Sequence, residues 1–194
     1  MPNKPYHHGD LRNSLIEAGI ELINRTGAGQ FSLRKVCKLC GVSQTAPYSH
    51  FQSKEDLLEA MQDHVTQKLT EVLEGAVHAC PEKNDQRELI EMGKSYVLFF
   101  INNPQYFQFL FSEASMRIDL SLDSDSSKNF PPFEMLKTIV FRVWGKNGMS
   151  KEKLEDTIIH LWATVHGLAS IATMKNVRYD KDWAAKIEDI IWNK

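Results

Sequence analysis

Apolar residues recur every three or four positions along most of the chain, which is the period of an amphipathic α-helix. The first such stretch follows Asp10, a capping residue, and ends at Thr26 and Gly27. Further helices are predicted at residues 33–40, 44–50, 54–77, 86–102, 104–115, 132–146, 151–176 and 181–192. No segment alternates polar and apolar residues as a strand would. The sequence therefore predicts an all-α fold.

Two short helices around a tight turn are predicted between Ser32 and Lys54. Ser32 and Ser43 each precede a helix-forming run as N-cap residues, and Gly41 stands where a left-handed C-cap is needed. Small and apolar side chains are expected to pack beneath the turn: Val36, Cys37, Leu39 and Val42. This arrangement is a helix-turn-helix, which presents its second helix, here residues 44–50, to the major groove of DNA.

Other capping residues define the remaining helices. Ser53 and Asp56 form a capping box at the start of a long fourth helix. Ser150 and Asp180 are expected to cap the last two helices. The segment 117–129 is rich in Ser and Asp and predicts a mobile loop.

The length of 194 residues and the 42% hydrophobic content predict two domains, at residues 1–53 and 54–194. No apolar run approaches the roughly 20 residues needed to span a bilayer, so no membrane partner is expected. The polar start lacks a signal-peptide core, and three cysteines are few for a secreted disulfide framework. These features predict a cytoplasmic location.

The net charge of −2 is divided unevenly along the chain. Residues 1–53 contain six basic and three acidic residues, a net charge of +3. The remainder has 17 basic and 22 acidic residues, a net charge of −5. A basic N-terminal region in an otherwise acidic chain is typical of a protein that binds nucleic-acid phosphate through one region only.

Three segments resemble one known family. The block GVSQTAPYSHFQSKEDL at residues 41–57 resembles the signature of TetR-type transcriptional regulators. Residues 6–27 resemble the leading arm and first helix of one branch of that family, and LWATVHGL at residues 161–168 resembles the Trp and His-Gly signature of a C-terminal domain found there. The resemblance implies a three-helix N-terminal DNA-binding domain and a C-terminal helical ligand-binding and dimerisation domain. It implies a homodimer that binds double-stranded DNA at a palindromic operator, usually as a repressor, and leaves it when a small hydrophobic effector binds.

The predicted DNA contacts fall into two groups. Gln44 and Thr45, in the first turn of the second helix, are expected to read base edges. Backbone phosphate is expected to meet side chains that match family positions or stand at a helix start: Ser32, Arg34, Tyr48, His50 and Lys54. Packing of Tyr48 in the core is the alternative, with the others on a solvated face. Pro47 departs from the Leu or Ile common in the family.

A heptad seam runs along the penultimate helix, at Leu154, Ile158, Leu161, Val165, Leu168 and Ala172. With the last helix it predicts either a four-helix dimer interface or an internal core seam. The resemblance favours the dimer.

Aromatic residues gather between positions 96 and 144, where eight of the ten Phe lie. Most are expected in the core, and some around an apolar ligand cavity. The candidates for this pocket are Phe99, Phe107, Phe111, Phe141, Trp144, Trp162 and His166. A hydrogen-bonded structural role is the alternative for His166.

Other functions find less support in the sequence. Cys37 and Cys40 form a single CxxC, which cannot close a tetrahedral metal site, so packed cysteines are expected, with a thiol switch as the alternative. No metal or cofactor site is predicted, and no catalytic constellation has a convincing spacing, so an enzyme is not expected. A helical small-molecule carrier or interaction scaffold without DNA binding remains the second hypothesis.

Overall fold

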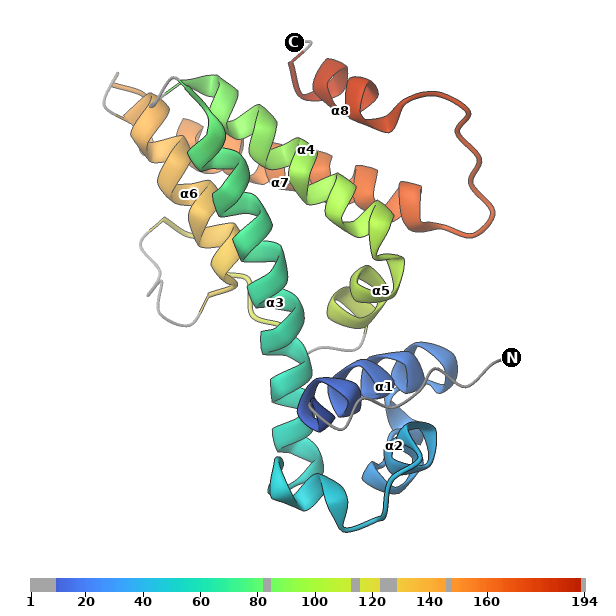
Figure 1. Ribbon diagram of the computed structural model, residues 1–194. Coiled ribbons are helices and arrows are strands. Elements are labelled where there is room, and N and C mark those ends of the chain that lie inside the picture. The colour runs from blue at the N-terminus through green and yellow to red at the C-terminus, as the bar shows by residue number, and fades with distance from the viewer. Residues whose placement is uncertain (1–9, 82–84, 113–115, 123–128, 146–147, 193–194) are drawn as a thin grey trace. The chain divides into compact units, whose positions relative to one another are not determined.

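A computed structural model describes residues 10–81, 85–112, 116–122, 129–145 and 148–192 (Figure 1). In these ranges the protein is all-helical, as predicted. The helices are α1 (Leu11–Thr26), α2 (Leu33–Cys40), α3 (Lys54–Ala79), α4 (Gln86–Asn102), α5 (Pro104–Ser112), α6 (Pro131–Trp144), α7 (Lys151–Thr173) and α8 (Trp183–Trp192). Two 3₁₀ helices, η1 (Ala28–Gln30) and η2 (Ala46–Ser49), flank α2. No helix in the described ranges has both the length and the apolarity that crossing a membrane requires.

The chain forms two compact units. Unit 1 comprises residues 1–65 and 108–114, and unit 2 comprises residues 66–107 and 115–194. Helix α3 therefore contributes its first half to unit 1 and its second half to unit 2. The predicted domain boundary between residues 53 and 54 stays a prediction.

Unit 1 is built on close packing of α1 with α2 and with the first half of α3. Its buried side chains include Leu15, Ile16, Ile20, Phe31, Val36, Phe51, Leu57 and Met61. A β carbon at Gly19 would lie 2.7 Å from the Met61 Sδ atom, so α1 and α3 approach closely at this glycine. Leu39, which was expected beneath the turn, is 45% exposed instead.

Local capping bonds confirm most of the predicted helix starts. Asp10, Ser32 and Ser150 each accept a hydrogen bond from the backbone amide three residues later. The Ser53 hydroxyl accepts from the Asp56 amide at 3.0 Å, and the Asp56 carboxylate accepts from the Gln52 amide at 2.8 Å. All but the bond from Gln52, which precedes α3, satisfy an amide that the first turn of a helix leaves unpaired.

Helix α8 begins differently from the prediction. The residue that caps it is Asp182, not Asp180, and its carboxylate accepts from the amides of Ala184 and Ala185. Two caps of the same type stand two residues apart, and Trp183 is the first helical residue. Sequence alone does not decide between such neighbouring caps, because packing of the helix sets its register.

Residues 117–122 are anchored, although a mobile loop was predicted there. The Asn129 side chain accepts from the Asp119 amide and donates to the Asp119 carbonyl, at 2.8 and 3.0 Å. Lys137, which is buried, donates to the Ser121 carbonyl and forms an ion pair with Glu134. The rest of the predicted loop, residues 123–128, lies outside the described residues.

Part of the predicted heptad seam lies in the core of unit 2. Leu154, Ile158 and Val165 are buried within this chain, so this part of the seam packs internally. The side of α7 left exposed carries a different set of residues, among them Ile159, Ala163 and Ile171. The alternative of an internal core seam is therefore confirmed for these three residues, while Leu161, Leu168 and Ala172 are half-buried.

Gly41 and Gly75 provide a matched pair of alanine substitutions. Gly41 ends α2 with φ of 68°, and a β carbon at either glycine would meet nothing within 4 Å. Gly41→Ala should lower the free energy of unfolding by about 1 kcal/mol, because the left-handed conformation disfavours a β carbon. Gly75→Ala, at an exposed position inside α3, should raise it by about 0.5–1 kcal/mol. Urea titrations measure both, and a loss at both positions would contradict this explanation.

Candidate functional site

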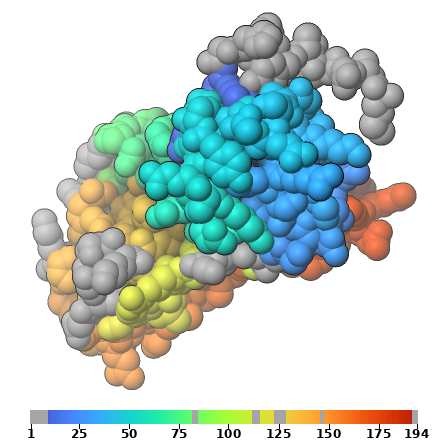
Figure 2. All heavy atoms as spheres, turned by 90° about the horizontal axis from the view of Figure 1, so that it is seen from below, coloured from blue at the N-terminus to red at the C-terminus, as the bar shows by residue number. Residues whose placement is uncertain are grey.

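The end of α2 forms the predicted turn of the helix-turn-helix. Gly41 is left-handed, its amide approaches the Lys38 carbonyl, and the Val42 amide donates to the Cys37 carbonyl at 3.1 Å. These bonds satisfy the last carbonyls of α2 and turn the chain towards η2. Figure 2 views the adjoining face of unit 1, where blue and cyan atoms of α2 and the residues after it form a continuous surface.

The second element of the motif is a 3₁₀ helix, whereas an α-helix over residues 44–50 was predicted. Its bonds run from the Tyr48 amide to the Thr45 carbonyl and from the His50 amide to the Pro47 carbonyl. Pro47 lies in the first turn and is buried, and it has no amide to donate. Ser43 does not cap this element, because its hydroxyl lies 3.1 Å from the Thr45 hydroxyl.

Four of the residues predicted to contact DNA lie on η2 or on the residues that flank it. Gln44, Thr45, Tyr48 and His50 are all exposed. Tyr48 is 61% exposed, so the alternative that it packs in the core is wrong. The neighbouring Pro47 is buried instead.

The predicted phosphate contacts differ in how freely they can move. Arg34 is exposed on α2, while Ser32 is half-buried and its hydroxyl already caps that helix. The Lys54 ammonium, at the start of α3, lies 5.6 Å from the centre of the Phe31 ring. A cation held over a ring face is positioned before any anion arrives.

Lys35 is a further fixed cation that the sequence did not single out. Its ammonium donates to both the backbone and the side-chain carbonyl of Gln30, each at 2.9 Å. Gln30 ends η1, a short element that the periodicity does not reveal. Because the sequence did not predict η1, it gave no reason to expect Gln30 beside the Lys35 ammonium.

The two cysteines of the CxxC are packed, as expected. Cys37 is 2% exposed, and the half-buried Cys40 thiol donates to the Ser14 carbonyl at 3.5 Å. Burial, and secondly the nearby Cys37, raise the pKa of the Cys40 thiol to about 11. The reactive thiolate is therefore scarce at neutral pH.

Thiol labelling tests this packing. At pH 8 about one thousandth of Cys40 is thiolate, so we expect no rapid reaction of the native protein with Ellman's reagent. Cys37 and Cys80 are buried and should be equally slow. In denaturant all three thiols should react at once, and rapid labelling of even one in the native state would contradict the prediction.

An aromatic group surrounds His166 in unit 2. Trp162 and His166 stack with ring centres 5.7 Å apart, which confirms that they share a helix face. The Tyr96 hydroxyl lies 3.2 Å from His166 Nδ1, and the Phe107 ring is 5.2 Å away. Burial lowers the pKa of His166, so its imidazole is neutral at pH 7.

The other predicted pocket residues are dispersed. Phe99 is buried, stacks on Tyr106 and lines an open groove of about 460 Å³ between α3, α4 and the start of α5. Phe111 belongs to unit 1, and Trp144 is half-buried at the end of α6. Phe141 is 56% exposed, so it points to the surface of α6. Of the seven candidates, Trp162 lines an apolar cavity.

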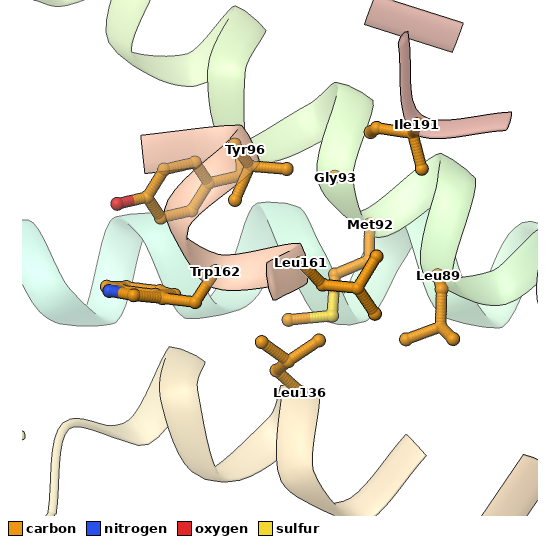
Figure 3. Close-up of a pocket in the computed structure, with 9 residues that line it drawn as sticks. Leu89, Met92, Gly93, Tyr96, Leu136, Leu161, Trp162 and Ile191 are labelled. Carbon is orange, nitrogen blue, oxygen red and sulfur yellow. The ribbon is translucent and has the colours of Figure 1, made fainter. Parts of the chain in front are cut away.

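That cavity lies in unit 2 between α4, α6, α7 and α8 (Figure 3). Its volume is about 20 Å³, and its lining is Leu89, Met92, Gly93, Tyr96, Leu136, Leu161, Trp162, Val165 and Ile191. The Tyr96 oxygen and the Trp162 nitrogen both point away from the aliphatic side chains in Figure 3. The cavity therefore offers hydrocarbon on all sides, with aromatic ring faces at one end.

Comparison with known proteins divides the chain in the same way as the motifs. Residues 15–61 match the family described as bacterial regulatory proteins, tetR family. Residues 89–191, more than half of the chain, match the tetracyclin repressor-like C-terminal domain.

Two Escherichia coli regulators are similar over the N-terminal part. The HTH-type transcriptional regulator BetI of strain E2348/69 is 31% identical over 78 residues, which span 40% of each chain. The tetracycline repressor protein class A from transposon 1721 is 32% identical over 73 residues, 38% of this chain and 31% of the repressor. The chain thus matches less than half the length of these curated relatives.

A solved structure extends the likeness of the fold. The transcriptional regulator FadR from Bacillus subtilis, in complex with stearoyl-CoA, superposes with a TM-score of 0.69 over 92% of this chain and 96% of FadR. Its sequence identity is 15%, so this likeness concerns the fold alone. With both halves matched in order, the chain belongs to the TetR family of bacterial transcriptional regulators, a family of regulators rather than enzymes.

Proposed function

We propose that this protein binds a palindromic DNA operator as a homodimer, represses transcription there, and is released by a small hydrophobic effector. The observation that carries the proposal is that Gln44 and Thr45, just before the second element of a helix-turn-helix, and Tyr48, within it, are all exposed. Residues 1–53 add a net charge of +3 to this end of an otherwise acidic chain. This basic N-terminal region fits a cytoplasmic protein that contacts chromosomal DNA through one of its two units.

Binding to DNA is tested by anisotropy of a labelled random-sequence duplex of about 30 base pairs. Counterion release predicts measurable affinity at about 50 mM salt and at least a tenfold loss at about 200 mM salt. Serum albumin, an acidic protein without a helix-turn-helix, is the control. Absence of binding at low salt would favour the carrier hypothesis.

The exposed side of α7 supports dimerisation. Ile159 and Ile171 are 42% and 46% exposed, and Ala163 lies between them. Apart from its chain neighbours and its own helix backbone, a β carbon at Gly167 would meet nothing within 4 Å, so a second helix has room to approach there. On α8, Ile190 adds a further exposed apolar residue. Two copies of this helix pair make a four-helix interface of the usual kind.

Ala163→Glu should therefore dissociate the dimer. Two carboxylates would be buried without partners, which should raise the dimer dissociation constant about a hundredfold. Ala79→Glu, the same change at the exposed end of α3, is the control and should have no effect. Sedimentation velocity measures both, and a dimer unchanged by Ala163→Glu would move the interface elsewhere.

Effector release is proposed from the apolar cavity and from the course of α3. The cavity is lined almost wholly by apolar atoms, and α3 runs from the unit that carries η2 into the unit that carries the cavity. A ligand that shifts α3 would change the spacing of two reading elements, which must match half-sites about 34 Å apart or a multiple of that distance. FadR, the structural neighbour, was solved with stearoyl-CoA, a ligand with a long acyl chain.

A further inference from the structure

The C-terminal helix α8 is the least anchored wall of the cavity. Of its described side chains, Ile187 alone is fully buried, and its surface tie is the ion pair of Glu188 with Lys94 at 2.9 Å. The connection from α7, residues 174–182, is exposed apart from the half-buried Tyr179. Figure 1 shows this long connection leading to α8. Elements with few buried contacts open at the lowest free energy.

Ile191 of α8 packs against the backbone of α4 at Gly93. A β carbon at Gly93 would lie 2.7 Å from Ile191 Cδ1 and 3.1 Å from Val165 Cγ1. Any residue with a β carbon at position 93 would therefore push against the end of the Ile191 side chain. The absence of a side chain at Gly93 creates the seat that Ile191 fills (Figure 3).

The cavity is too small for a ligand while Ile191 occupies this seat. Its volume of about 20 Å³ is that of a single water molecule, and its apolar lining gives water no partner. Typical ligand sites enclose about 300–1,000 Å³. A ligand must consequently displace part of the wall, and α8 is the wall that yields most easily.

We propose that Ile191 is a plug which an unbranched hydrocarbon chain replaces, and that α8 leaves α4 as the chain enters. The inference rests on the proposed effector-responsive function. The ligand class follows from the lining: aliphatic side chains surround the seat, and the polar atoms of Tyr96 and Trp162 point away from it. The buried part of the ligand is therefore pure hydrocarbon, and its polar head stays at the α8 end.

Movement of α8 would also reach the proposed dimer face. Ile190 precedes the plug by one residue and is 38% exposed on another side of the helix. A chain that expels Ile191 thus carries Ile190 with it. Ligand entry and the arrangement of two copies are coupled through one short helix, because each state of α8 has different contacts with the ligand.

The test uses the full chain and n-alkan-1-ols of increasing length, with calorimetry as the measurement. Ile191→Ala empties the seat, so it should bind the alcohols about tenfold more tightly and accept chains about two carbons longer than the parent does. Leu120→Ala removes the same number of carbon atoms from an exposed residue outside the cavity and outside the proposed dimer face, and it should bind as the parent does. Equal affinities for all three proteins, or no binding by any, would overturn the proposal.

Gly93→Ala tests the seat from the other side. Its new methyl group would push Ile191 out, so the amides of α8 should exchange hydrogen faster without any ligand. In the parent, addition of the alcohol should accelerate the same amides. Exchange in α8 that is unchanged by Gly93→Ala, or slowed by the alcohol in the parent, would refute the plug.

Duplex affinity, measured on the same proteins, separates this inference from the proposed function. Alcohol binding that depends on Ile191 but never releases DNA would sustain the plug and refute effector release. Release of DNA by the alcohols with equal potency in the parent and in Ile191→Ala would sustain effector release and refute the plug.

Discussion

Phe100→Ala should lower the free energy of unfolding of unit 2 by about 3–5 kcal/mol. Phe100 is 0% exposed, and its ring packs edge-on against Tyr96, Phe99 and Phe107 with ring centres 5.0–5.2 Å apart. Truncation leaves a cavity among rings that cannot all move inward together. All four tryptophans belong to unit 2, so their fluorescence in a urea titration reports its unfolding.

Phe141→Ala is the matched control for this loss. It deletes the same atoms from a side chain that is 56% exposed on α6, so it should cost less than about 1 kcal/mol. Equal losses for the two variants would mean that Phe100 does not lie in the centre of the core.

Gln44→Ala should change which duplexes the protein prefers, because a base-reading side chain contributes about 1–3 kcal/mol of discrimination. Lys54→Ala should instead weaken all duplexes alike, by about tenfold, and reduce the slope of log affinity against log salt by about 1. The reason is that a phosphate contact carries no sequence information. Competition binding with a set of related duplexes at two salt concentrations measures both effects.

Thermal unfolding provides the control for this pair. Gln44 is exposed, so Gln44→Ala should leave the melting temperature unchanged. Lys54→Ala removes only a cation over the Phe31 ring, so its effect on the melting temperature should be small. If both variants lost affinity with no change in preference, Gln44 would not be a base-reading residue.

Capping residues were the most predictable part of the fold. Asp10, Ser32, Ser53 and Ser150 were assigned as capping residues from sequence. Each side chain accepts a hydrogen bond from a backbone amide in the structure. Gly41 likewise has the left-handed conformation that its position after α2 requires. These features depend on a few neighbouring residues, so local chemistry is enough to predict them.

Choices made by tertiary packing were less predictable. The residue type of Phe141 favours burial, yet it is exposed, whereas Leu154, Ile158 and Val165 of the heptad seam are buried within this chain. Periodicity gives the spacing of a helix face but not the surface that covers it. Similarly, Pro47 was expected to fit the first turn of an α-helix, but η2 ends after four residues.

The cavity shows the same limit for the candidate site. Aromatic residues drew attention to Trp162, whereas most of its walls are aliphatic residues from four helices far apart in sequence. Gly93 and Ile191 meet across almost a hundred residues, and nothing local marks either of them. Only the packing of α8 on α4 brings them together.

The central claim is sequence-specific DNA binding by two copies of the chain, and selection of bound duplexes from a random pool tests it most directly. The purified protein, free of added ligand, is incubated with the pool, and bound duplexes are amplified and sequenced over several rounds. The bound duplexes should contain an inverted repeat whose half-sites lie about one helical turn, or a multiple of it, apart. A pool that stays random after several rounds, with no duplex bound even at low salt, would contradict it.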